Sequence, residues 1–170
     1  MSSRGTCTGN CDHHPQVCVD WCDAYAYCSS VGKRLCGAIG GGGSVRADAS
    51  NASTNQWYRA CSSAGKYKYP YGSAYDERYC NGPETGVGTT LEVGTLDTCR
   101  SPDKDYAGVF DMSGNVYEWV DSCDSDDQDA VCGVRGGAYS NQGDTLPCSS
   151  FGSGTRNGIA NTFGFRCCAP

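Results

Sequence analysis

Basic residues and histidines are scarce in this chain. Its 170 residues include 13 lysines and arginines against 19 aspartates and glutamates, a formal net charge of −6, and only two histidines. A nucleic-acid-binding domain normally carries a basic stripe or patch, so this class of protein is disfavoured. Apolar runs are short as well: none approaches the roughly 18 residues that a membrane-spanning helix needs, so insertion into a membrane is excluded.

Cysteine and glycine are abundant instead, with 14 cysteines and 24 glycines. In a reducing cytosol so many thiols would stay reactive, whereas an even number in a secreted or periplasmic protein is typical of a disulfide framework. We therefore expect most cysteines to be bridged and the protein to be exported, with metal clusters as the alternative. The first residues do not form a signal peptide, so either a leader has been removed or the chain is a piece of a longer protein.

The chain length suits one domain, and the pattern of its regular elements predicts an α+β fold rich in loops. Apolar residues recur with helical spacing between Val19 and Val31, with Asp20 as the N-cap and Gly32 as the stop signal. Further elements are expected in four places: a helix over 54–62 and strands over 116–120, 131–135 and 162–167.

One segment is unusual in both composition and order. Residues 108–120 read Gly-Val-Phe-Asp-Met-Ser-Gly-Asn-Val-Tyr-Glu-Trp-Val, and they strongly resemble the signature of the formylglycine-generating enzymes, also called sulfatase-modifying factors. Further motifs follow the family's order over 15–35, 56–61, 69–72, 135–139 and 164–167. The resemblance implies a disulfide-stapled, loop-rich variant of the C-type-lectin-like fold. It would comprise an N-terminal tail (1–14) and a domain (15–170) with a glycine-rich insertion (36–53).

Two departures from the family pattern bear on function. The long stretch that normally precedes the motif at Pro15 is absent, so the domain is truncated, compensated differently or completed by another chain. Active members carry two copper-binding cysteines shortly after the Arg-Gly-Gly motif, whereas Asn141 stands at the first of these positions and no cysteine at the second. Cys148 aligns better with a structural cysteine than with a displaced catalytic thiol. Copper is therefore not expected, because its monovalent ion needs thiolate ligands.

The resemblance also implies two disulfide bonds, which join Cys28 to Cys167 and Cys61 to Cys148. The run over 121–129 holds five aspartates in nine residues, and we expect it to be a solvated acidic loop closed by Cys123 and Cys132. It mimics the alternation of a calcium loop but lacks the glycine needed for the sharp turn. Cys168, which directly follows Cys167, is expected to end a separate bridge.

A calcium site is implied within the signature itself. In the family the ion is held by the residues that correspond to Asp111, Gly114, Val116 and Glu118. Two carboxylates and two backbone carbonyls are the hard oxygen donors that calcium requires. The alternative is that Asp111 caps a turn and Glu118 pairs with an arginine. A second calcium site of the family begins at an asparagine that matches Asn81, but its later ligands cannot be aligned here.

Three functions from different classes are compatible with the sequence. The first is a secreted, catalytically inactive relative that binds a protein or glycan ligand. The variable proteins of diversity-generating retroelements use the segment after the Arg-Gly-Gly motif of this scaffold for binding, and by analogy the contact residues expected here are Tyr139, Asn141, Asp144, Phe151, Arg156 and Asn157. The second is a self-associating subunit of an extracellular fibre or coat. The third is an oxidase that forms formylglycine from a sulfatase cysteine.

Overall fold

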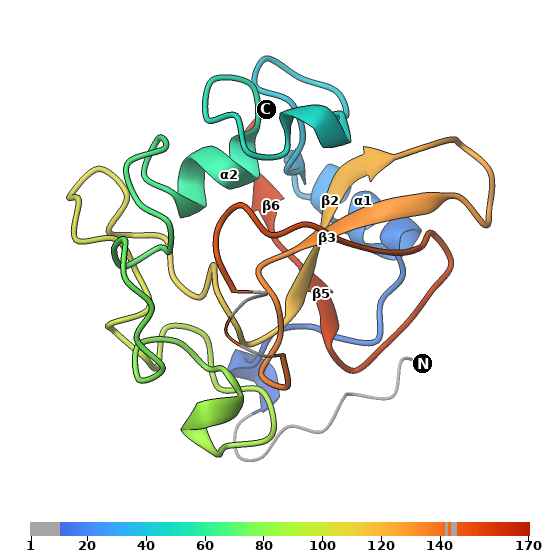
Figure 1. The fold of residues 1–170 in the computed structure, drawn as a ribbon. Helices are drawn as coiled ribbons and strands as arrows, with labels where there is room; N and C mark the ends of the chain where they lie inside the picture. The colour runs from blue at the N-terminus through green and yellow to red at the C-terminus, as the bar shows by residue number, and fades with distance from the viewer. Residues whose placement is uncertain (1–10, 142, 144–145) are drawn as a thin grey trace.

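The computed structural model describes residues 11–141, 143 and 146–170, and regular structure is sparse in them (Figure 1). Within these residues the α-helices are α1 (Trp21–Ser30) and α2 (Gln56–Cys61), and the 3-10 turns are η1 (Cys11–His13), η2 (Arg46–Asp48) and η3 (Pro83–Thr85). The strands are β1 (Arg34–Leu35), β2 (Tyr117–Cys123), β3 (Val131–Arg135), β4 (Gly152–Thr155), β5 (Phe163–Phe165) and β6 (Cys167–Cys168). No helix in the described ranges is long and apolar enough to cross a bilayer.

The strands form a large and a small sheet. The large sheet has the order β4-β3-β2-β5, and the small one pairs β1 with β6. Strand β3 runs antiparallel to both β2 and β4, whereas β5 runs parallel to β2. The mixture of short helices with small mixed sheets confirms the α+β, loop-rich fold class expected from the sequence.

Helix α1 forms where the periodicity predicts it. The carboxylate of Asp20 accepts a hydrogen bond from the backbone N–H of Asp23 at 2.8 Å, which is the N-cap contact. Gly32 adopts a φ of 70° just after the helix, a left-handed conformation that glycine reaches without strain. Both ends of the helix are therefore determined by local sequence.

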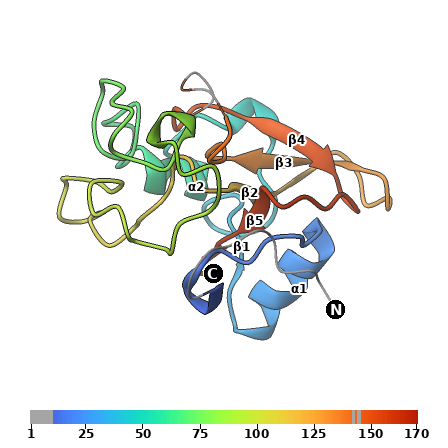
Figure 2. The same cartoon turned by 90° about the horizontal axis from the view of Figure 1, so that it is seen from below.

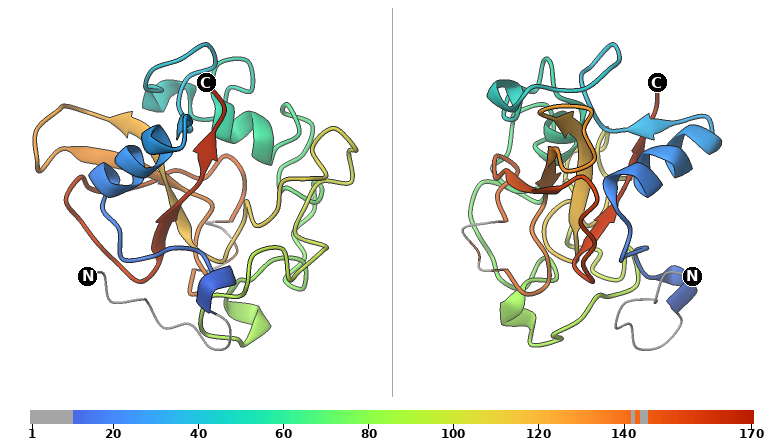
Figure 3. Two further views of the ribbon diagram at one scale, coloured as in Figure 1. Left: turned by 180° about the vertical axis from the view of Figure 1, so that it is seen from behind. Right: turned by 90° about the vertical axis from the view of Figure 1, so that its right-hand side faces the viewer.

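The buried side of α1 packs against one face of the large sheet (Figures 2 and 3). The core cluster on this side draws on both elements and includes Trp21, Ala24, Cys28, Trp119, Cys132 and Val134. Because neighbouring strand residues point to opposite faces, Val120 and Gly133 face the other side. There Val120 belongs to a second cluster, with Cys36, Trp57, Cys61, Met112 and Cys148.

Five disulfide bonds link the described elements: Cys28–Cys167, Cys36–Cys168, Cys61–Cys148, Cys80–Cys99 and Cys123–Cys132. The bridges expected for Cys28, Cys61 and Cys123 are all present. The adjacent Cys167 and Cys168 end two separate bridges, as predicted, and so attach β6 both to α1 and to the residue after β1. Since five bonds use ten of the 14 cysteines, most of the thiols are cross-linked.

Candidate functional site

The signature segment enters β2 through a tight loop. Asp111, Gly114 and Asn115 all have positive φ angles, of 58°, 71° and 62°. A Cβ at Gly114 would lie 2.3 Å from the backbone oxygen of Asn81, so only glycine fits this close approach. Left-handed conformations of residues other than glycine concentrate at functional sites, which makes this loop a candidate for ligand or metal binding.

Asn81 ties the signature loop to the long loop region that precedes it. Its side-chain amide nitrogen donates to the carbonyl of Thr89 at 3.0 Å and to Oδ1 of Asn115 at 3.2 Å, and its Oδ1 accepts from the hydroxyl of Thr85. The side chain is almost fully buried, with a residue exposure of 2%. Asn81 thus acts as a cross-link between loops in this structure, and its role as a calcium ligand stays a prediction.

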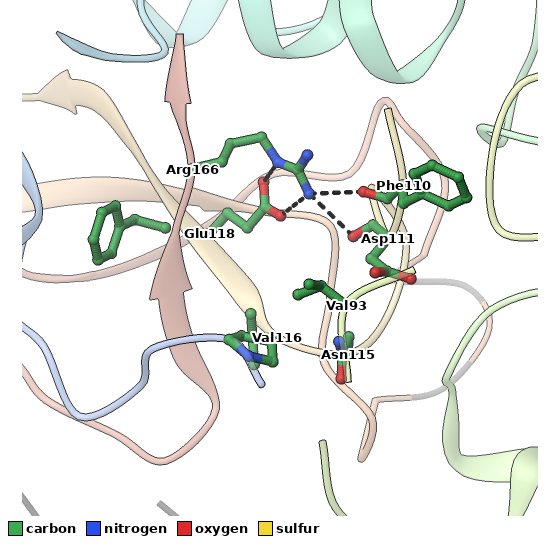
Figure 4. Close-up of a pocket in the computed structure, with 9 residues that line it drawn as sticks. Val93, Phe110, Asp111, Asn115, Val116, Glu118 and Arg166 are labelled. Atoms are coloured by element: carbon green, nitrogen blue, oxygen red, sulfur yellow. Dashed lines mark hydrogen bonds and ion pairs between the residues drawn. The ribbon is translucent and has the colours of Figure 1, made fainter. Parts of the chain in front are cut away.

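Glu118 and Arg166 form a largely buried ion pair beside this loop (Figure 4). Nε of Arg166 donates to Oε2 of Glu118 at 2.6 Å, and Nη2 donates to Oε1. The indole of Trp57 donates to the same carboxylate at 2.7 Å. Nη2 also donates to the backbone oxygens of Phe110 and Asp111. Burial lowers the pKa of Arg166, but Glu118 more than offsets this and holds it above its ordinary value.

The Asp111 carboxylate, by contrast, has no cationic partner in the described part of the chain. Oδ2 accepts a hydrogen bond from the backbone N–H of Gly94 at 2.7 Å. Burial raises the pKa of this carboxyl, against the attraction of the Arg166 guanidinium. Asp111 borders a cavity of about 260 Å³ that Val116 and Glu118 also line. Arg166 lines the same cavity and pairs with Glu118, which is the alternative expected from the sequence, and the described residues hold no group of three or more acidic, histidine or cysteine side chains that could bind a metal ion, so calcium at this loop stays a prediction.

Calcium would be held by the Asp111 carboxylate, the carbonyls of Gly114 and Val116, and Glu118, which would share its carboxylate with Arg166. A bound ion would stabilise the loop by joining these oxygen donors. We expect saturating calcium to stabilise the fold by about 2.7 kcal/mol at a hundredfold excess over the dissociation constant. For a chain of this size that corresponds to roughly 5–10 °C in melting temperature. Differential scanning calorimetry with and without a chelator measures this shift.

Asp111→Asn is the matched variant, because its amide oxygen can still accept from Gly94. Since the folded-state pKa of Asp111 is raised, metal-free stability is greatest below the unfolded pKa and falls as pH rises through the folded pKa. Asp111→Asn should therefore melt slightly higher than the wild type in chelator at neutral pH, and should lose the calcium-induced rise. A chelator that leaves the wild-type melting temperature unchanged would contradict the calcium prediction.

A second concave site lies on the face of the large sheet opposite α1. We call this site the groove; its volume is about 380 Å³. It is lined by Ser44, Val45, Arg46, Ser122, Cys123, Asp124, Val131, Cys132, Gly133, Phe151 and Ser153. Phe151 lies directly over Gly133, where a Cβ would come within 2.5 Å of the ring. Glycine in β3 thus determines where the aromatic ring lies in the groove.

Two arginines lie against the Phe151 ring. The Arg46 guanidinium is 5.0 Å from the ring centroid and that of Arg135 is 5.5 Å away. Arg135 is buried, with 1% exposure, and also lies 4.7 Å from the Trp57 ring. It donates to the backbone oxygens of residues 49 and 148, and burial lowers its pKa to about 10. The Arg-Gly-Gly motif therefore attaches the glycine-rich insertion to the sheet beneath Phe151.

The residues predicted to contact a ligand lie in different surroundings. Phe151 lines the groove, and Asn157 is exposed. Arg156 instead lies over the Trp21 ring at 4.6 Å, with an ion pair to Asp126 at 3.8 Å. Of these predictions, only Phe151 borders one of the two concave sites described above.

Two of the other predicted contact residues add little exposed surface. Tyr139 is buried, with 8% exposure. Asn141 is half-buried, and its Oδ1 accepts from the backbone N–H of Ala138 at 2.9 Å. Asp144 lies outside the described residues. Val45 and Arg46 were not among the predicted contact residues, because both belong to the insertion, which has no counterpart in the family motifs.

Cys148, the cysteine nearest to the positions of the copper ligands, is not a thiol in this structure. It is bridged to Cys61, and both are buried with exposures of 1% and 0%. This arrangement agrees with the structural role expected for Cys148 rather than with that of a displaced catalytic thiol.

Comparison with known proteins places these features in a family. The profile of the sulfatase-modifying factor enzyme 1-like domain matches residues 2–169. The serine/threonine-protein kinase pkn1 of Chlamydia caviae is 29% identical over 171 residues, which cover 91% of this chain but 24% of the kinase. The chain thus spans about a quarter of that relative's length.

Solved structures share the fold at low sequence identity. Treponema denticola variable protein 1 superposes with a TM-score of 0.68 at 16% identity, covering 99% of this chain and 76% of that one. CarF superposes with a TM-score of 0.66 at 18% identity, covering 96% of this chain and 71% of CarF. The chain belongs to the family of sulfatase-modifying factor enzyme 1-like domains.

Proposed function

We propose that this domain is a secreted binding module that holds a partner in the groove and does not form formylglycine. The observation that carries the proposal is the groove itself, which is concave, of the size of ordinary ligand sites, and built in part by the insertion. Val45 and Val131 are 63% and 45% exposed on its two sides. Large apolar side chains that gather in one exposed concave place are typical of a binding surface.

Three further observations support the proposal. Asn141 and the bridged Cys148 leave no thiol pair in the segment where active members of the family hold copper. The five disulfides suit an oxidising compartment such as the cell exterior or the periplasm, which supports secretion. A matching region that forms a quarter of a longer kinase supports use of this fold as a module.

Filling the space beneath Phe151 tests the proposal. We expect Gly133→Ala to displace the ring, since the new methyl group would come within 2.5 Å of it, and to weaken groove binding at least tenfold, which corresponds to about 1.4 kcal/mol. The matched control is Gly108→Ala, where a Cβ would meet no atom within 4 Å. A random heptapeptide library displayed on phage would be selected on the wild-type protein, and each enriched peptide titrated against both variants.

The proposal requires that enriched peptides bind Gly108→Ala as tightly as the wild type and bind Gly133→Ala weakly. Circular dichroism and melting curves establish that both variants are folded. Enriched peptides that bind both variants equally, or a selection that enriches nothing, would count against the groove as the binding site.

A further inference from the structure

We infer that the groove docks an extended segment of a partner protein in which one apolar side chain lies between an acidic and a basic one. This inference rests on the proposed binding function and adds the chemistry of the occupant. It follows from the two walls of the groove, which carry the same apolar residue type and opposite charges.

One wall belongs to the insertion and the other to the hairpin of β2 and β3. In the first wall Val45 is followed by Arg46 at the start of η2. In the second, Val131 begins β3 and is joined to Asp124, whose Oδ1 accepts from its backbone N–H at 2.9 Å. Each wall therefore presents a half-exposed valine beside a charged side chain, positive on one side and negative on the other.

These two charges do not neutralise each other. No ion pair joins Arg46 to Asp124, and within the described residues the Arg46 side chain makes no hydrogen bond or ion pair with any other group. The Arg46 guanidinium instead lies over the Phe151 ring, 5.0 Å from its centroid, and its donors stay open to a carboxylate. An occupant that brings an acidic group to Arg46 and a basic group to Asp124 completes both pairs.

The surroundings strengthen the negative wall. Asp126, Asp127 and Asp129 follow Asp124 in the same hairpin, and only Asp126 has an arginine, Arg156, within 4 Å among the described residues. Charges of one sign at the mouth of a cleft attract the opposite charge from a distance and orient a partner on approach. The basic group of the occupant is therefore expected at the hairpin side of the groove.

The centre of the groove is apolar and would hold the apolar side chain of the occupant. Val45, Val131 and Phe151 surround it, and Gly133 contributes no side chain. Ser122 and Ser153 are among the lining residues, and serine hydroxyls can bond to the backbone of an extended chain. A peptide presents such a pattern over a few residues, since its side chains alternate along an extended backbone.

Four fluorescein-labelled pentapeptides with leucine at the centre test the charge pattern by fluorescence polarisation. Two carry mixed charges, Glu-Gly-Leu-Gly-Lys and Lys-Gly-Leu-Gly-Glu, because the chain direction is not specified by the walls. Two carry like charges, with lysine or glutamate at both ends. Each exposed ion pair contributes up to about 1 kcal/mol, so the better mixed peptide should bind wild-type protein roughly fivefold to tenfold tighter than either like-charged peptide.

Variants that reverse the charge of one wall test the inference more sharply than the peptides alone. Arg46→Glu should shift the preference to the peptide with two lysines, and Asp124→Lys to the peptide with two glutamates. The matched controls are Lys104→Glu and Asp105→Lys, which make the same changes in net charge at exposed positions away from the groove. Asp124→Asn provides a milder variant if Asp124→Lys disturbs the hairpin, and it should only weaken the preference for the mixed peptide.

The outcomes separate this inference from the proposed function. Preferences that the reversals leave unchanged, with binding still lost in Gly133→Ala, overturn the charge pattern but leave the groove as a binding site. Binding that Gly133→Ala does not weaken overturns both. Free leucine that competes as well as an unlabelled pentapeptide would point to a small zwitterion and overturn the assignment to a protein segment, as would the absence of measurable binding by any of the four peptides.

Discussion

Replacing Arg166 by methionine is expected to lower the free energy of unfolding by about 3–5 kcal/mol, because it leaves the buried Glu118 carboxylate without its cation. For a chain of this size the melting temperature should fall by roughly 6–20 °C. The methionine keeps much of the apolar volume of the arginine stem. The loss therefore reports on charge and hydrogen bonding, which the guanidinium supplies to Glu118 and to the carbonyls of Phe110 and Asp111.

A double-mutant cycle with Glu118→Gln separates the pair from general damage to the core. The double variant should be less destabilised than the sum of the two single changes, because it leaves no unpaired buried charge. Arg78→Met is the surface control: Arg78 pairs with Asp76 at 2.7 Å, but its side chain is 78% exposed, so a much smaller loss of stability is expected. Urea titration gives all the values. If Arg166→Met lowers the free energy of unfolding no more than Arg78→Met does, Glu118 and Arg166 do not form a stabilising buried ion pair.

The Glu118–Arg166 pair also shows how far the sequence could be interpreted. The alternative in which Glu118 pairs with an arginine follows from residue type alone, but which arginine does so depends on β5 lying parallel to β2 across about 45 intervening residues. Helix α1 was predicted correctly because its cap, its apolar period and its stop are all local signals. The strand over 131–135 was also predicted with its observed bounds.

Other elements could not be predicted, because their cause is tertiary. Strand β4 reads Gly-Ser-Gly-Thr, which has neither apolar alternation nor β-branched bulk until its last residue, and it is a strand because β3 pairs with it. The groove has the same origin. Its lining brings Arg46 of the insertion next to Phe151 and β3, segments about 85 to 105 residues apart in the chain. Single positions in a glycine-rich loop carry no signal of such a contact.

Removal of the two bridges to β6 together is expected to produce the largest loss of stability. Cys28–Cys167 and Cys36–Cys168 span 139 and 132 residues and close nearly the same loop. Because Cys61–Cys148 shortens the effective loop to about 50 residues, in the chain-entropy model the first of them to form contributes about 4 kcal/mol. The second then closes only a short remaining loop of about nine residues and adds roughly 2–3 kcal/mol. Loss of either bridge alone should therefore cost the smaller amount, because the other still restrains the unfolded chain.

Alanine in place of each cysteine pair gives the cleanest comparison, since Cys28 and Cys36 are buried and serine would bring unpaired hydroxyls into the core. We expect about 2–3 kcal/mol for each single-bridge variant and about 6–7 kcal/mol for the variant that lacks both, measured by urea unfolding without reductant. The control is the Cys80–Cys99 bridge, which spans 19 residues and shortens the larger loops that contain it only slightly. Its removal should cost about 3 kcal/mol and should add to that of either single bridge. A combined loss at β6 equal to the sum of the two single losses would show that the bridges act through local packing and not through restraint of the unfolded chain.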